Sequence, residues 1–93
     1  MKKYDNIFQS VLLQAGESKV IQKALEELSE LSTALWQSNK IPADMVKQEI
    51  ADVKIMIQQL EGIFGSVESE VEFKMSRLEK RIKSNELEKG MLK

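Results

Sequence analysis

Five acidic side chains follow helical spacing in two segments of the chain. Glu26, Glu27 and Glu30 form a first acidic group, in which side chains three or four residues apart share one helix face. Glu49 and Asp52 form a second group with the same three-residue spacing. Two antiparallel helices would bring these carboxylates together, where they repel one another and raise one another's pKa values. Such a cluster persists only where a cation occupies it.

The cation expected at these carboxylates is Mg²⁺, with Mn²⁺ as the alternative. Hard divalent ions prefer oxygen ligands, and the nearby Lys23, Lys47 and Lys54 are scattered along the chain rather than matched to the acidic groups. The sequence has no Cys and no His, which excludes thiol nucleophiles, imidazole bases and Cys/His zinc sites. Because Mg²⁺ usually binds through carboxylates plus substrate phosphates, the pattern indicates nucleotides or other phosphate esters.

Glu49 distinguishes this pattern from an ordinary polar helix face. On a helical wheel it falls inside the apolar arc of its helix, between Leu60 and Met56. A carboxylate among core positions is costly unless it is paired or bound to a cation. For the first acidic group alone, a solvated helix face is the simpler interpretation, but adding the second group favours a metal site.

A basic edge lies near the C-terminus. Lys74, Arg77 and Arg81 flank the apolar stripe of the last helix, in a stretch with five basic residues and one acid. These three side chains could hold phosphate. A solvated helix edge that pairs with Glu70 or with another subunit explains them equally well.

The elements that position these residues are helices. The single Pro and four Gly punctuate the chain sparsely, and no hairpin signal occurs, so we predict an all-α fold. The expected helices are a short one ending near Gly16 and three longer ones over about residues 19–38, 42–63 and 66–84. Ser18 and Ser66 are the expected N-caps of the second and fourth helices.

Each longer helix carries an apolar stripe that we expect to face a core. The stripes are Ile21, Ala24, Leu25, Leu28, Leu31 and Leu35, then Val46, Ile50, Val53, Ile57 and Leu60, then Val67, Val71, Met75, Leu78 and Ile82. Short links favour an antiparallel pair of the second and third helices within a four-helix bundle. Since a chain this short buries only about 60 to 65% of its surface, we expect self-association to complete the bundle.

The 93 residues form one domain at most, with a frayed tail over about residues 85–93. Lys and Arg number 14 against 15 Asp and Glu, so no global field favours a nucleic-acid polymer or an anionic membrane. No stretch approaches the roughly 20 apolar residues of a membrane span. We therefore expect a cytoplasmic protein.

Three segments carry a resemblance to a known family. Residues 24–31 (ALEELSEL) and 48–53 (QEIADV) resemble the paired motif of the MazG-like all-α nucleoside triphosphate pyrophosphohydrolases, Glu-Glu-x-x-Glu followed by Glu-x-x-Asp. All five acidic positions match. Residues 73–81 (FKMSRLEKR) are similar to the basic fourth-helix segment of compact, often phage-encoded members. The resemblance covers nearly the whole chain and implies a MazG-like helical bundle.

The resemblance also implies a reaction and a site. Members hydrolyse a (d)NTP to the (d)NMP and pyrophosphate with Mg²⁺, at sites between helices and commonly between subunits of dimers or tetramers. The metal ligands carried over onto matching positions are Glu27, Glu30, Glu49 and Asp52. Glu26 would bind a further ion or orient the attacking water. Lys74, Arg77 and Arg81 would stabilise charge on the substrate phosphates.

Other functions stay open. A non-catalytic helical interaction or regulatory module with a degenerate acidic site would show the same charges without functional Mg²⁺ binding. Phosphoribosyl-ATP pyrophosphohydrolases and all-α dUTP or dCTP hydrolases share the helical scaffold and the acidic pattern. No motif in the sequence selects a base, because base recognition depends on pocket shape and a few polar contacts.

Overall fold

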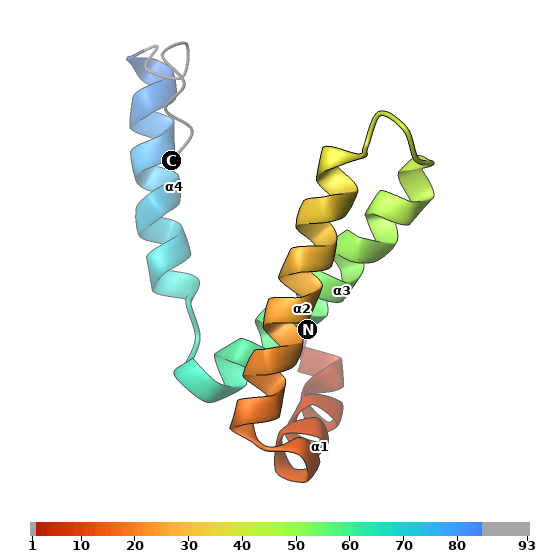
Figure 1. Ribbon diagram of the computed structural model, residues 1–93. Coiled ribbons are helices and arrows are strands. Elements are labelled where there is room, and N and C mark those ends of the chain that lie inside the picture. Colours follow the sequence, from red (N-terminus) through yellow and green to blue (C-terminus); the bar gives the residue numbers. More distant parts are fainter. Residues whose placement is uncertain (1, 85–93) are drawn as a thin grey trace.

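The computed structural model describes residues 2–84, and within them every regular element is helical. A 3₁₀ turn at Lys2–Tyr4 leads into α1 (Asp5–Ala15), α2 (Glu17–Trp36), α3 (Ala43–Phe64) and α4 (Glu68–Lys83) (Figure 1). The predicted all-α class is confirmed, and the predicted tail at 85–93 lies outside the described residues. No helix in residues 2–84 has both the length and the apolarity needed to cross a bilayer.

An antiparallel pair of helices, α2 and α3, forms the body of the chain, as predicted (Figure 1). Its core consists of Val20, Ala24 and Met56. The short helix α1 packs against both partners and covers this core with Val11 and Leu12. The three N-terminal helices therefore form one packed unit that holds the acidic residues of α2 and α3 in fixed positions.

The junction between α1 and α2 is tighter than the sequence predicts. Gly16 ends α1 as expected, with a φ of 85° that favours glycine, and its N–H donates to the carbonyl of Leu12 at 2.9 Å. The prediction of Ser18 as the next N-cap is wrong, because the turn at Gly16 lets α2 begin at Glu17. At α4 the N-cap is Val67, although Ser66 Oγ accepts a hydrogen bond from the N–H of Glu68 at 3.3 Å.

The contact between α2 and α3 uses only one edge of the predicted stripe of α2, the edge that contains Ala24, and extends beyond the stripe to Ala34. The helices meet where α2 presents the small residues Ala24 and Ala34, which allow close approach. Leucines on the predicted stripe, Leu25, Leu28 and Leu35, are exposed, as are Ile50 and Ile57 of α3. The prediction that these five residues face a core within the chain is wrong. Together they form an outer apolar face of the hairpin.

Helix α4 stands apart from the rest of the described chain. It packs against none of α1, α2 and α3 (Figure 1). Gly65, with a φ of 100°, begins the short link that leads the chain away from α3. The apolar stripe of α4 is consequently exposed at Val71, Met75 and Ile82, against the prediction of inward packing. One chain thus presents three packed helices and one unpartnered amphipathic helix.

Candidate metal centre

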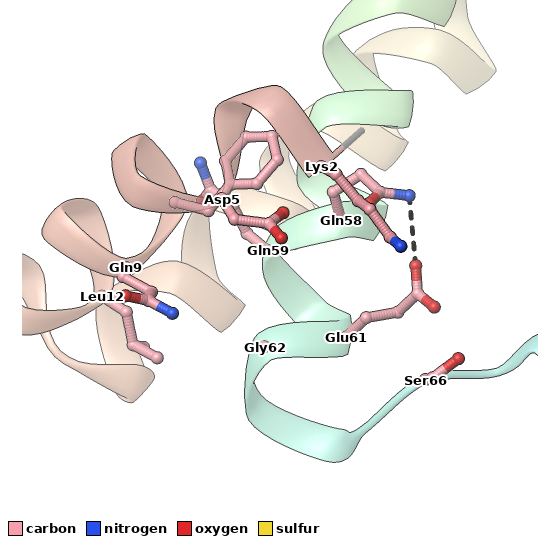
Figure 2. Close-up of a pocket in the computed structure, with 10 residues that line it drawn as sticks. Lys2, Asp5, Gln9, Leu12, Gln58, Gln59, Glu61, Gly62 and Ser66 are labelled. Carbon is pink, nitrogen blue, oxygen red and sulfur yellow. Dashed lines mark hydrogen bonds between the residues drawn. The ribbon is translucent and has the colours of Figure 1, made fainter.

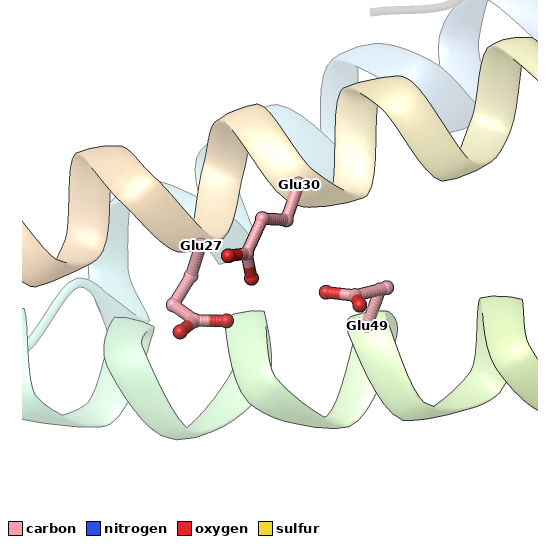
Figure 3. A group of neighbouring side chains, drawn as sticks. All are labelled: Glu27, Glu30 and Glu49. Atoms are coloured by element: carbon pink, nitrogen blue, oxygen red, sulfur yellow. The ribbon is translucent and has the colours of Figure 1, made fainter.

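Three of the five predicted acidic residues meet between α2 and α3. Glu27 and Glu30 project from neighbouring turns of α2, and Glu49 projects toward them from α3 (Figure 3). One carboxylate oxygen from each residue lies within 4.8 Å of the others. We call this group the acidic trio. A divalent ion bound by oxygens at about 2.0 to 2.6 Å could be held by such a group.

A bound cation would stabilise the buried carboxylates of the trio most strongly. Glu27 is only 6% exposed, because it sits on the side of α2 that faces α3, level with the core. Within residues 2–84, Glu27 Oε2 and Glu49 Oε2 are buried and have no hydrogen-bond partner. A buried carboxylate oxygen without a partner is costly, and a metal ion bound by Glu27 and Glu49 through these oxygens would offset that cost. The residues present therefore fit a hard divalent cation.

Lys23 offsets part of the negative charge from one side. Its Nζ lies 3.1 Å from Glu27 Oε1 and 3.7 Å from Glu26 Oε2, one turn earlier on α2. The hydrogen bond and charge of Glu27 raise the pKa of Lys23 above its ordinary value. This ion pair occupies Oε1 of Glu27 and leaves Oε2 directed into the structure without a partner.

Repulsion within the trio acts most clearly on its exposed member. The charge of Glu27 is the main cause that raises the pKa of Glu30, followed by desolvation and by the charge of Glu49. Glu30 therefore holds its proton more strongly in the folded protein than in the unfolded chain. A cation between the carboxylates would reverse this effect by favouring the ionised form.

This shift predicts a pH dependence of the metal-free protein. Between the ordinary carboxyl pKa of 4.5 and the raised pKa of Glu30, the folded state binds more protons than the unfolded state. The contribution of Glu30 to the free energy of unfolding therefore falls as pH rises through this window. Chemical denaturation in EDTA at a series of pH values will show that decline in the native protein and a weaker decline in Glu30→Gln. Identical pH profiles would contradict it.

The other predicted site residues lie outside the trio. Asp52 follows Glu49 by about one turn of α3 and is exposed, and Glu26 is exposed beside Lys23. Neither belongs to the group whose oxygens converge. On α4, the guanidinium of Arg77 lies 5.9 Å from the centroid of the Phe73 ring. Because α4 does not pack on α2 or α3, one chain does not bring its basic edge to the trio.

A cavity of about 310 Å³ adjoins the trio and was not predicted from the sequence. Its lining residues are Ser29, Glu30, Thr33, Ala34, Gln37, Ile41, Met45 and Glu49. We call it the trio cavity, because Glu30 and Glu49 belong to both. A signal existed in the sequence, since Ser29, Thr33 and Gln37 continue at four-residue spacing along one face of α2.

A larger cavity, of about 460 Å³, lies between α1 and the C-terminal end of α3 (Figure 2). One of its polar lining residues, Glu61, already has partners, since Gln58 Nε2 donates to Oε2 at 3.2 Å and the N–H of Val67 donates to Oε1 at 3.0 Å. None of the trio lines this cavity. Glu61 therefore holds the start of the link to α4 and contributes nothing to the acidic centre.

Comparison with models of protein families, with curated proteins and with solved structures found no match for the chain. What the centre can do follows from its own chemistry. Two facing helices supply three carboxylates, two of which have buried oxygens without partners, and a cavity opens beside them. This arrangement suits a hard divalent cation with room for a further ligand.

Proposed function

We propose that the protein is a Mg²⁺-dependent nucleoside triphosphate pyrophosphohydrolase, with Mn²⁺ as a substitute ion. The observation that carries the proposal is the meeting of Glu27, Glu30 and Glu49 with two buried, unpartnered oxygens. These residues occupy three of the five acidic positions of the MazG-like motif that the sequence resembles. Convergence in space of residues first grouped by that motif supports a shared role in binding a metal and its phosphate substrate.

The proposed reaction breaks one phosphoanhydride bond. A water oxygen bonds to the α-phosphorus, and the bond from that phosphorus to the bridging α–β oxygen breaks. The electron pair of the broken bond leaves with pyrophosphate. A carboxylate of the centre accepts the proton of the water. Bound Mg²⁺ would neutralise phosphate charge and favour ionisation of the attacking water. Asp52, on the same helix as Glu49, would complete the ligand set, and Glu26 would orient the water.

We propose further that the active form is a dimer or tetramer. Exposed apolar residues lie on the outer face of the α2–α3 hairpin and along α4, and contact between two copies would bury both surfaces. Helix α4 does not reach the trio of its own chain. Association would allow Lys74, Arg77 and Arg81 to contact a phosphate group bound at the trio of another copy. We therefore propose a role for the basic edge in phosphate binding only in the associated protein.

A single charge placed on the apolar face will test association. Leu28 is exposed and lies in the middle of α2, so Leu28→Lys should leave the chain folded while placing an unpaired charge in the interface. Light scattering at micromolar concentration should show a dimer or tetramer for the native protein and a monomer for the variant. Gln22→Lys, which adds the same charge at another exposed position of α2, is the control. A monomeric native protein would contradict the proposal.

The reaction is tested by measuring pyrophosphate and monophosphate release from standard and modified NTPs and dNTPs, with Mg²⁺ and with EDTA. Metal-dependent release of both products, lost in Glu49→Gln, is the expected result. No release from any substrate by a folded protein that also fails to bind Mg²⁺ would overturn the proposal and favour the non-catalytic interaction module.

A further inference from the structure

We propose that the trio cavity receives the base and sugar of the nucleotide and that Gln37 discriminates between bases. This inference rests on the function proposed above and assigns the part of the site that determines its substrate preference. It follows from the position, shape and chemistry of the cavity, which are described in turn.

The position of the cavity gives the ligand a direction. Glu30 and Glu49 form one end, which is shared with the trio, and Gln37 and Met45 lie toward the other. Gln37 follows Glu30 by nearly two helical turns, which corresponds to about 10 Å along α2. A nucleotide whose phosphates lie at the trio would therefore extend along the cavity toward Gln37.

The charge of the cavity determines which end of the nucleotide can enter. The lining includes two carboxylates and no Lys or Arg. A phosphate group in the cavity would meet Glu30 and Glu49 without any cation from the lining, so the phosphates belong at the trio with the metal. The uncharged base and sugar are the parts of the substrate that the cavity accommodates.

The walls favour a flat, largely apolar group. Ala34, Ile41 and Met45 supply apolar surface, and a methionine thioether makes favourable contacts with aromatic rings. The volume of about 310 Å³ is near the lower end of the roughly 300 to 1,000 Å³ that small-molecule sites occupy. This size suits a single base with its sugar rather than a larger ligand.

Gln37 supplies the polar contact. Within residues 2–84 its side-chain amide has no hydrogen-bond partner, whereas the hydroxyl of Thr33 already donates to the carbonyl of Ser29 at 3.1 Å. An amide offers a donor and an acceptor side by side, and the edges of nucleobases present the same kinds of groups. Gln37 is therefore the lining residue best suited to distinguish one base from another.

The test compares ligands with and without a base, and it measures binding rather than turnover. Calorimetry with Mn²⁺ present would use inorganic tripolyphosphate, which has no base, and a panel of NTP and dNTP analogues with an α,β-imido link, which the proposed reaction does not cleave. Gln37→Leu removes the amide at similar size, and Thr33→Trp fills the cavity from its exposed side. Gln22→Leu, at an exposed position outside the cavity, is the matched control. Circular dichroism verifies that each variant is helical.

The native protein should bind its preferred nucleotide more tightly than tripolyphosphate. Gln37→Leu should lower the affinity for that nucleotide by roughly 3- to 10-fold, as expected for one lost hydrogen bond, and reduce the differences in affinity between bases. Thr33→Trp should lower the affinity for every nucleotide, while the affinity for tripolyphosphate stays unchanged in both variants. Unchanged nucleotide affinity, or equal losses for nucleotides and tripolyphosphate, would overturn the assignment of the cavity.

These outcomes separate the inference from the function on which it rests. A native protein that binds neither Mn²⁺ nor tripolyphosphate would overturn both. Nucleotide binding with the expected variant pattern but without pyrophosphate release would overturn the hydrolytic function and leave the cavity assignment in place. Pyrophosphate release with no effect of either variant on nucleotide affinity would overturn the cavity assignment and leave the hydrolytic function in place.

Discussion

Replacing Glu49 with glutamine should abolish turnover and metal binding while leaving the helices intact. Glu49 is the only member of the trio on α3, so the substitution removes the ligand that joins the two helices through the ion. Loss of a residue that hydrogen-bonds to a metal ligand commonly lowers metal affinity or activity by about 10- to 100-fold. We expect loss of a direct ligand to lower them further. Glutamine keeps the size of the side chain, so packing against α2 is preserved.

Three measurements on purified Glu49→Gln test this expectation. Calorimetry with Mn²⁺ reports metal affinity, pyrophosphate release reports turnover, and circular dichroism reports helix content. The matched control is Glu72→Gln, which removes the same charge from an exposed position on α4 outside the trio. Metal affinity and turnover equal to those of the native protein would contradict the metal assignment. Loss of helix content would instead show that Glu49 is needed for folding.

Adding Mg²⁺ or Mn²⁺ to the metal-free protein should raise its thermal stability substantially. The trio places like charges together, and binding of a cation to the folded state alone adds about 2.7 kcal/mol to the free energy of unfolding at 100 times its Kd. For a chain of this size that corresponds to a rise in Tm of roughly 10 to 20 °C. Addition of EDTA should reverse the change.

Two comparisons distinguish binding at the trio from general screening of charge. NaCl at the same ionic strength screens repulsion between exposed charges and should give a much smaller shift in Tm. The variant Glu49→Gln should show little response to the divalent ion. Without metal it should be at least as stable as the native protein, because one repulsive charge is gone. Equal shifts with NaCl and with the divalent ion would show that no specific site exists.

Local features of the fold could be predicted from the sequence because they depend on near neighbours. Helical periodicity and the turn at Gly16 located the helices to within a few residues. The same periodicity placed Glu49 among core positions and grouped it with Glu27 and Glu30, which the structure brings together. Spacing along a helix is sufficient for such predictions, since it determines which side chains share a face.

The face of α2 that meets α3 could not be predicted in this way. Its apolar arc is wide, with leucines such as Leu28 at one side and the small residues Ala24 and Ala34 toward the other. Leucine favours burial by area, but alanine allows the helix axes to approach more closely, and the tertiary contact uses the alanine side. The use of the alanine side also determines how Glu27 is buried and where the trio cavity opens, so the leucine stripe indicated neither. The four-residue spacing of Ser29, Thr33 and Gln37 was the one periodic signal for the cavity.

The position of α4 has a consequence for how the chain folds. Most of the stability of a helix in a protein comes from packing of its amphipathic face, and α4, with 16 residues, obtains no packing from α1, α2 or α3. Its helicity is therefore limited to its intrinsic preference, plus local pairs such as Lys83 Nζ and Glu79 Oε1 at 3.6 Å, until another surface covers it. If two copies associate through α4 as proposed, dilution would change the secondary structure of the protein as well as its size, and formation of α4 would be a bimolecular step in folding.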